Sequence, residues 1–150
     1  MIAIGSDHAG YPLKEEIKKH LESKGLVYKD FGTSSTESCN YAEMAVAPCK
    51  AVRSGKCLLA ILICGTGIGI SIAANKHNGI RAAACSDYFS AKFTRLHNNA
   101  NALCLGARVV GAGLAIEMVD IFLATEFECG RHTQRVQYFT EIEKGENHGA

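Results

Sequence analysis

Residues 61–70 read Ile-Leu-Ile-Cys-Gly-Thr-Gly-Ile-Gly-Ile. The apolar run ending at Cys64 is typical of a buried strand, and the glycine-rich turn after it leads into a helical pattern. Glycines at such a junction let backbone N–H groups converge on an anion, and the helix dipole favours a thiolate over a thiol. Cys64 is therefore a candidate nucleophile or base. The alternative interpretation is a buried strand cysteine followed by a tight turn without chemical consequence.

Strand-like and helix-like patterns alternate on both sides of this turn. Short apolar runs predict strands, and apolar residues recurring every three or four positions predict helices. Pro48 lies inside one predicted helix and is expected to kink it or delay its start. The predicted strands are 2–6, 26–31, 58–64, 80–85 and 102–105, and the predicted helices lie near 13–21, 41–54, 68–77, 88–96, 112–124 and 132–144.

This alternation predicts the α/β class, as a single domain over residues 1–150. The expected architecture is a doubly wound, Rossmann- or flavodoxin-like five-stranded parallel sheet with helices on both faces. In the strand order 2-1-3-4-5, the first and third strands are neighbours at the point where the order reverses. Ligands bind there, beyond the carboxyl ends of the strands. Asp7, His8 and Cys64 are therefore expected to share one crevice.

Composition limits the class of protein. The chain has 150 residues, a hydrophobic fraction of 47% and a net charge of +1, which gives no reason to expect nucleic acid or an anionic membrane as partner. No apolar run approaches the roughly 20 residues of a membrane span, and the N-terminus does not read as a signal peptide. The seven cysteines form no Cys-x-x-Cys pair. They are interpreted as reduced thiols in a cytoplasmic protein, without a zinc site.

Several basic residues suit a phosphate group. Arg131 and Arg135 stand four apart at a predicted helix start, and Arg108 and His8 follow predicted strands. The alternative for the arginine pair is a solvated helix face with ordinary salt bridges. His97 is a candidate acid–base group, because histidine is the side chain that ordinarily changes charge near neutral pH, but a capping or surface role is the alternative. The glycine spacing after the third strand matches neither a dinucleotide fingerprint nor a P-loop.

Taken together, the motifs resemble those of the ribose-5-phosphate isomerase type B family, within the wider group that includes galactose-6-phosphate and allose-6-phosphate isomerases. The resemblance covers nearly the whole chain. The motifs that carry it are Gly5-Ser-Asp7-His8-Ala-Gly-Tyr11, Ile63-Cys64-Gly-Thr66-Gly-Ile-Gly69-Ile-Ser-Ile-Ala-Ala-Asn75-Lys76, Gly79-Ile-Arg81, His97-Asn98-Asn99-Ala-Asn101, Leu105-Gly-Ala-Arg108-Val-Val-Gly111, and Gly130-Arg131-His132 with Arg135.

The resemblance implies an aldose–ketose isomerase that interconverts ribose 5-phosphate and ribulose 5-phosphate in the pentose phosphate pathway, through a cis-enediolate and without metal or cofactor. It implies that Cys64 is the base, that Thr66 and the turn residues Gly65, Gly67 and Gly69 stabilise the oxyanion, and that His97 opens the sugar ring with Asp7 and Asn98 nearby. It assigns the phosphate to His8, Arg108, Arg131 and Arg135. It also implies a homodimer or a dimer of dimers with shared active sites.

One segment departs from the family pattern. The family usually carries Asp-Tyr-Pro-Asp where this chain has Asn40-Tyr41-Ala42-Glu43. Because Tyr41 is expected near the sugar, the preferred substrate length stays open, and a six-carbon sugar phosphate (allose 6-phosphate or galactose 6-phosphate) is an alternative. A non-catalytic sugar-phosphate-binding module is a second alternative. It would need only the arginines and has no use for Cys64 and His97 together.

Overall fold

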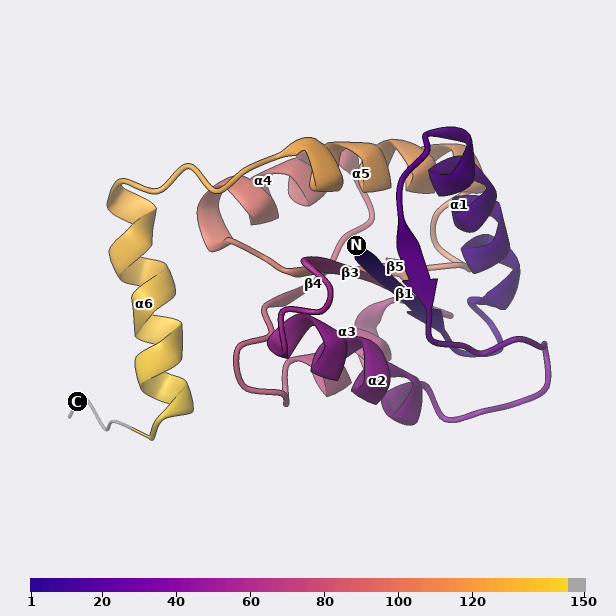
Figure 1. The fold of residues 1–150 in the computed structure, drawn as a ribbon, viewed down its shortest axis with the longest axis horizontal. Helices are drawn as coiled ribbons and strands as arrows, with labels where there is room; N and C mark the ends of the chain where they lie inside the picture. The colour runs from indigo at the N-terminus through magenta and orange to yellow at the C-terminus, as the bar shows by residue number, and fades with distance from the viewer. Residues whose placement is uncertain (146–150) are drawn as a thin grey trace.

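The computed structural model describes residues 1–145, which form five strands and six helices in alternation (Figure 1). Both types of element follow the predicted pattern closely. In chain order they are β1 (Ile2–Ser6), α1 (Tyr11–Ser23), β2 (Tyr28–Asp30), α2 (Tyr41–Arg53), β3 (Leu59–Cys64), α3 (Ile68–Ala74), β4 (Ala82–Ala84), α4 (Tyr88–Asn98), β5 (Ala102–Gly106), α5 (Ala112–Ala124) and α6 (Arg131–Glu143).

All strand pairs are parallel, and the order across the sheet is β2-β1-β3-β5-β4. The predicted order 2-1-3-4-5 is therefore wrong at one edge, because β5 lies between β3 and β4. The burial of the two strands agrees with this order. β5 is buried at every position, whereas β4 is three alanines that are half-buried or exposed, as suits a short edge strand.

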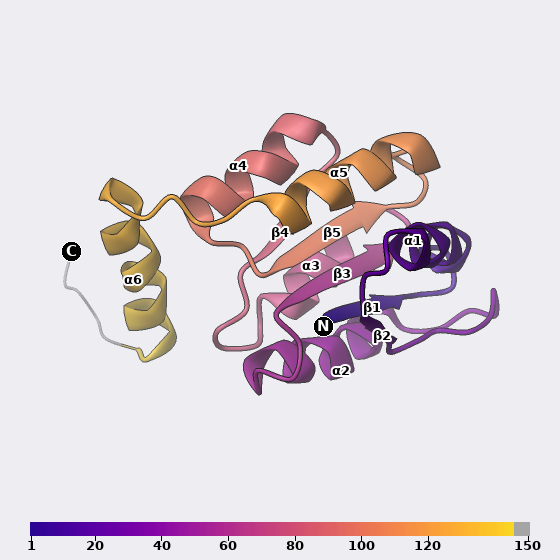
Figure 2. The ribbon, with the colours of Figure 1, turned by 45° about the horizontal axis from the view of Figure 1, so that its top comes forward.

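Helices cover both faces of the sheet, as predicted. α1, α4 and α5 lie on one face and α2 and α3 on the other (Figure 2). The side chains of β3 alternate between the two resulting cores. Ile61 and Ile63 join the core under α1 and α5, and Leu62 and Cys64 join the core under α2 and α3. This register places the sulfur of Cys64 on the α2–α3 side of the sheet.

Pro48 neither delays the start of α2 nor interrupts it. The helix begins at Tyr41, where the Asn40 side chain caps it by accepting a hydrogen bond from the Ala42 N–H at 3.0 Å. Pro48 is buried and packs against β1 at Gly5, where an added Cβ would lie 3.2 Å from its ring. The missing side chain of Gly5 thus makes room for the proline. The expectation of a delayed start is wrong because this packing and the cap hold the helix in place.

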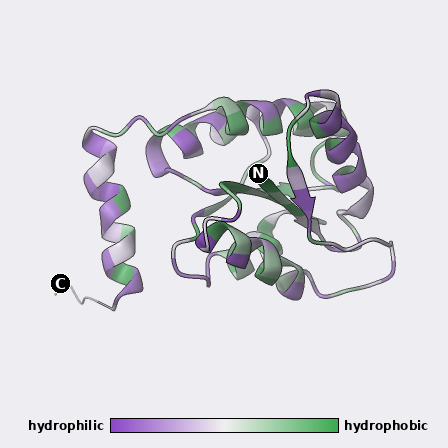
Figure 3. Cartoon of the chain, in the orientation of Figure 1, coloured by the Kyte–Doolittle hydropathy of each residue, from purple (hydrophilic) through white to green (hydrophobic). Residues whose placement is uncertain are grey.

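α6 stands apart from the two helical layers and contacts mainly α4 (Figures 1 and 2). Hydrophilic and hydrophobic residues alternate along it (Figure 3), and Phe139 and Ile142 are exposed. An exposed apolar stripe on a projecting helix is typical of a surface that another chain covers. None of the helices within residues 1–145 is long and apolar enough to span a bilayer.

Candidate active site

The carboxyl ends of β1, β3 and β5 meet at one edge of the sheet, and a crevice of about 400 Å³ opens there. Asp7 follows β1, Cys64 ends β3 and Arg108 follows β5. All three line the crevice, together with His8, Ala9, Tyr41, Gly65, Thr66, Ile68 and Gly69. The expected meeting of Asp7, His8 and Cys64 is therefore present. It follows from parallel pairing, which brings strand ends together at one edge.

Cys64 is almost fully buried, and its sulfur accepts a hydrogen bond from the Gly67 N–H at 3.2 Å. The donor belongs to the turn, so the sulfur is tied to the glycine-rich backbone that follows it. The Cys64 carbonyl accepts a hydrogen bond from the Ala107 N–H at 2.9 Å, which ties β3 to the loop after β5. The sulfur is thus held in a fixed position beside the turn.

The turn after Cys64 requires glycine at two positions. Gly67 has a φ of +78°, and an added Cβ would lie 2.9 Å from the backbone of Leu105. At Gly69 an added Cβ would lie 2.7 Å from the ring of Tyr41. The first glycine lets the chain reverse beneath β5. The second lets the Tyr41 ring lie directly over the backbone, where it forms a wall of the crevice.

Two further residues of the crevice, His8 and Thr66, can donate hydrogen bonds from their side chains. The Nδ1 atom of His8 accepts a hydrogen bond from the Cys39 N–H at 3.2 Å, so the ring carries its proton on Nε2 when neutral. The Thr66 hydroxyl accepts from the Ile68 N–H at 3.3 Å, which leaves its own proton to donate. Asp7 is buried and accepts a hydrogen bond from the Gly10 N–H at 2.9 Å, at the start of α1.

Arg108 lies in the crevice because β5, the strand before it, is the neighbour of β3. Its backbone N–H donates to the Gly65 carbonyl at 3.0 Å, and its side chain lies over Gly65, where an added Cβ would be 3.4 Å from Nη1. In the order 2-1-3-4-5, β4 would separate β5 from β3. The corrected order therefore strengthens the expectation that Arg108 belongs with Cys64.

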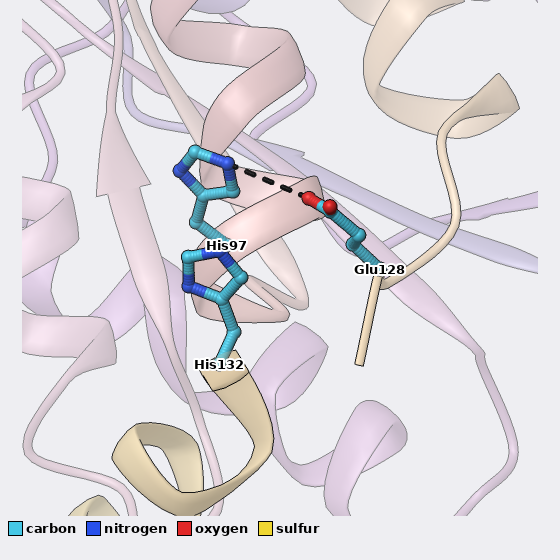
Figure 4. Close-up of side chains that lie close together, drawn as sticks. All are labelled: His97, Glu128 and His132. Carbon is cyan, nitrogen blue, oxygen red and sulfur yellow. Dashed lines mark ion pairs between the residues drawn. The ribbon is translucent and has the colours of Figure 1, made fainter. Parts of the chain in front are cut away.

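The remaining predicted site residues lie elsewhere in the chain. His97, Asn98 and Arg135 line a second crevice between α4, β4 and α6, and Arg131 is exposed at the start of α6. The His97 ring packs against His132 with ring centres 4.1 Å apart (Figure 4). The sequence interpretation put Asp7 near His97, but within one chain they line different crevices. The predicted residues thus divide between two crevices of the chain.

Comparison with known proteins identifies the family to which the chain belongs. Residues 2–139 match the family model described as Ribose/Galactose Isomerase. The chain belongs to the ribose/galactose isomerase family. It is 49% identical to ribose-5-phosphate isomerase B of Escherichia coli over 146 residues, which are 97% of this chain and 98% of that protein.

Solved structures of the isomerase family agree with the fold. The Clostridium thermocellum ribose-5-phosphate isomerase B is 52% identical with a TM-score of 0.95, over 96% of this chain and 97% of that one. The Mycoplasma genitalium ribose-5-phosphate isomerase B, solved with bound ribulose-5-phosphate, is 39% identical with a TM-score of 0.91 and 95% coverage of both chains. The Rossmann-like prediction is therefore confirmed.

Three groups that bind metals in other proteins come together in this isomerase chain, although the sequence showed no such spacing. The ligand atoms of His97, Glu128 and His132 all lie within 4.8 Å of one another. Sequence reasoning noted His132 only as part of a motif and missed Glu128 entirely. Two elements, β5 and α5, separate Glu128 from His97 in the sequence, so only the fold brings the two residues together.

The departure from the family pattern at residues 40–43 is accommodated locally. Besides capping α2, Asn40 donates a hydrogen bond from its side-chain amide to the Glu43 carboxylate at 3.1 Å. Asn40 is thus occupied with the helix start, and Tyr41 is the residue of this segment that lines the crevice. We find no contact in the described residues that would make Asn40 part of the sugar site.

Proposed function

We propose that this chain interconverts ribose 5-phosphate and ribulose 5-phosphate through a cis-enediolate, as a single isomerase domain over residues 1–150. The observation that carries the proposal is the Cys64 sulfur, buried at the end of β3 and facing the Gly67 N–H. The names of the relatives and the ribulose-5-phosphate bound to the Mycoplasma genitalium protein support the substrate.

In the proposed reaction, the Cys64 thiolate removes the proton from C2 of the open-chain aldose and returns a proton to C1. Negative charge develops on the carbonyl oxygen at O1, and a second proton moves between O2 and O1. The Thr66 hydroxyl and the backbone of the 65–69 turn, which line the same crevice as Cys64, are proposed to stabilise that charge, as in an oxyanion hole. The burial of Cys64 supports this role because it limits competition from water.

Four residues are proposed to hold the phosphate: His8, Arg108, Arg131 and Arg135. His8 can donate from Nε2 because its Nδ1 already accepts from a backbone N–H. Arginines add charge-assisted hydrogen bonds, which suit phosphate oxygens. His97 is proposed to open the sugar ring, with Asn98 beside it.

We propose that the two crevices are the first and second half-site of an active site shared between chains. The first has the base and the oxyanion donors, while the second has His97 and Arg135. We propose that α6 of one chain reaches the first crevice of its partner in a homodimer, or a dimer of dimers. Exposed apolar residues on α3 and α6, namely Ile68, Ile72, Phe139 and Ile142, support a covered surface of this kind.

Other features of the proposal rest on chemistry rather than on contacts. The oxyanion hole takes the place of a Lewis acid, so we propose a metal-independent reaction without cofactor. All seven cysteines are free thiols, which supports a cytoplasmic location. A net charge of +1 supports neither nucleic acid nor a membrane as partner.

Turnover by the purified protein tests the function. Ribose 5-phosphate should be converted to ribulose 5-phosphate faster than allose 6-phosphate or galactose 6-phosphate is isomerised. A faster six-carbon reaction would show that the Tyr41 wall admits a longer sugar and would correct the substrate. Tight binding of ribose 5-phosphate without turnover of any of these sugars would instead favour the sugar-phosphate-binding module.

A further inference from the structure

The side chains of His97, Glu128 and His132 form a cluster, and the two histidines also line the second crevice (Figure 4). The Glu128 carboxylate lies 3.6 Å from His97 Nε2. The imidazole planes of His97 and His132 are stacked, at 11° to one another. The rings of Phe93 and His97 pack edge to face, with ring centres 5.0 Å apart. His97 is thus in contact on three sides.

Two histidines and a carboxylate are ligand types that bind zinc, but their geometry here does not suit a metal ion. Lone pairs of imidazole lie in the ring plane, so those of two nearly parallel rings run side by side and do not point at a common centre. In addition, the Arg131 Nε–H donates to His132 Nε2 at 3.3 Å, which places a cation where the metal would bind. The arrangement of the cluster suits proton transfer better than binding of a metal cation.

Glu128 is brought to His97 by the backbone. The Glu128 N–H donates to the Leu96 carbonyl at 3.1 Å, directly before His97 at the end of α4. Arg95 ties the same segments together, since its Nε–H donates to the Thr125 carbonyl at 3.1 Å and its Nη1 to the Ala100 carbonyl at 2.6 Å. The hydrogen bonds to the Leu96 and Thr125 carbonyls hold the loop against the end of α4, which keeps the Glu128 backbone beside His97.

His132 does not add a second positive charge beside His97 and Glu128. Burial, with the neighbouring His97, Arg131 and Arg135, lowers the pKa of His132. Its ring therefore stacks on His97 in the neutral form near neutral pH, and it can support the ring of His97 without repelling an imidazolium. The Glu128 carboxylate lies on the remaining side of the His97 ring.

We propose that Glu128 is a positioning residue that orients His97 and balances its charge for opening of the sugar ring. The inference rests on the proposed ring-opening role of His97. In that step the C1–O4 bond breaks, its electron pair goes to O4, and O1 becomes the carbonyl oxygen. His97 gives a proton to O4 and recovers one from O1, so that the residue returns to its starting form.

The two directions of the reaction separate ring opening from enediolate chemistry. Ribose 5-phosphate is a furanose in solution and must be opened. Ribulose 5-phosphate is acyclic because its O5 carries the phosphate, and the open aldose formed from it can close after release. Substitution of Glu128 should therefore slow the reaction of ribose 5-phosphate and spare consumption of ribulose 5-phosphate.

The experiment compares three variants of the full chain in both directions. Glu128→Gln should lower kcat/KM for ribose 5-phosphate about tenfold, the effect of losing one charge-assisted contact, with ribulose 5-phosphate consumed at close to the wild-type rate. His97→Asn should show the same asymmetry more strongly. Glu126→Gln removes an exposed carboxylate from the same loop and should behave as wild type.

The outcomes separate a failure of the positioning role of Glu128 from a failure of the ring-opening role of His97. If His97→Asn shows the asymmetry and Glu128→Gln matches Glu126→Gln, Glu128 does not position His97 and the inference is wrong. Equal slowing of both directions by Glu128→Gln would also overturn it. If His97→Asn shows no asymmetry, the ring-opening role itself is wrong. Matching thermal unfolding of Glu128→Gln and Glu126→Gln excludes a folding defect, as expected for an exposed side chain.

Discussion

Cys64 differs from the other buried thiols of this chain in the group that faces its sulfur. Burial raises the pKa of Cys49 and of Cys85 to about 11 each, and it raises the pKa of Cys104 well above its ordinary range. These three thiols therefore stay protonated near neutral pH. Within the described part of the chain, Cys64 is the only one of these four cysteines whose sulfur accepts a hydrogen bond from a backbone N–H.

Replacing this sulfur tests its role as the base. Cys64→Ser keeps nearly the same volume, but a hydroxyl is far too weak a base to replace a thiolate. We expect kcat for ribose 5-phosphate to fall by roughly 10²–10⁴-fold, the usual worth of a general base. Cys85→Ser and Cys104→Ser serve as controls and should retain kcat much closer to wild type. Wild-type kcat in Cys64→Ser would show that another group removes the proton.

The residues of the first half-site could be predicted from the sequence because they follow strands. Strand ends are readable from hydrophobic patterns, and parallel strands bring their ends together. Glu128 could not be predicted in this way. It lies in a loop, and its proximity to His97 depends on how that loop packs against the end of α4.

At the scale of elements, α1 is joined to β2 by a buried ammonium group. The Lys14 side chain is 1% exposed, and its Nζ donates to both oxygens of Asp30 and to the Thr33 carbonyl, each at 2.7 Å. Burial acts to raise the pKa of Asp30, but hydrogen bonds from Lys14 and the Gly32 N–H outweigh it and leave the pKa below its ordinary 3.8. The carboxylate thus stabilises the folded state when ionised.

This pair predicts how stability depends on pH. Because the folded pKa is lowered, the contribution is complete above pH 3.8 and is lost as the pH falls through the lowered value. Asp30→Ala should lower the free energy of unfolding at pH 7 by roughly 3 kcal/mol, since it leaves Lys14 buried without its partner. The difference from wild type should shrink below about pH 4.

Denaturant unfolding at fixed protein concentration between pH 7 and about pH 2 measures both effects. Glu16→Ala is the matched control, because its pair with Lys19 is exposed and should be worth about 0.5 kcal/mol at most. An Asp30→Ala deficit that stays constant down to the lowest pH would show that the carboxylate's charge is not what stabilises this contact.

Element types and bounds were predictable, but the order of strands was not. Periodicity reports which residues are buried together within one element. It does not report which strand lies beside which, and β5 and β4 exchanged places relative to expectation. The exposure of the three β4 alanines, which marks an edge strand, is visible only in the structure. Pro48 misled for a related reason, because its packing partner Gly5 is distant in sequence.

At the scale of the whole molecule, the proposed reaction makes no use of a metal ion. Prolonged dialysis of the purified protein against a strong chelator should leave kcat for ribose 5-phosphate unchanged. The cluster of His97, Glu128 and His132 is where a metal dependence would arise if this expectation were wrong. Loss of activity that a divalent ion restores would contradict the metal-independent route.

Phosphate binding belongs to the same scale, because Arg135 lies in the other half-site from Cys64. Each charge-assisted contact is worth about 1.5–3 kcal/mol, so Arg135→Ala should lower kcat/KM for ribose 5-phosphate at least about tenfold. Unphosphorylated ribose should react poorly with both proteins and should be insensitive to the change. Equal losses for both sugars would show that Arg135 does not act on the phosphate.

The most direct test of a site shared between two chains is to mix two variants of low activity. Cys64→Ser lacks the base of the first half-site and Arg135→Ala lacks a phosphate contact of the second. After subunit exchange, a mixed dimer carries one site with both groups intact, so isomerisation of ribose 5-phosphate should return in part. If mixed dimers demonstrably form and no activity returns, Cys64 and Arg135 do not complete one site from two chains, and the account is contradicted.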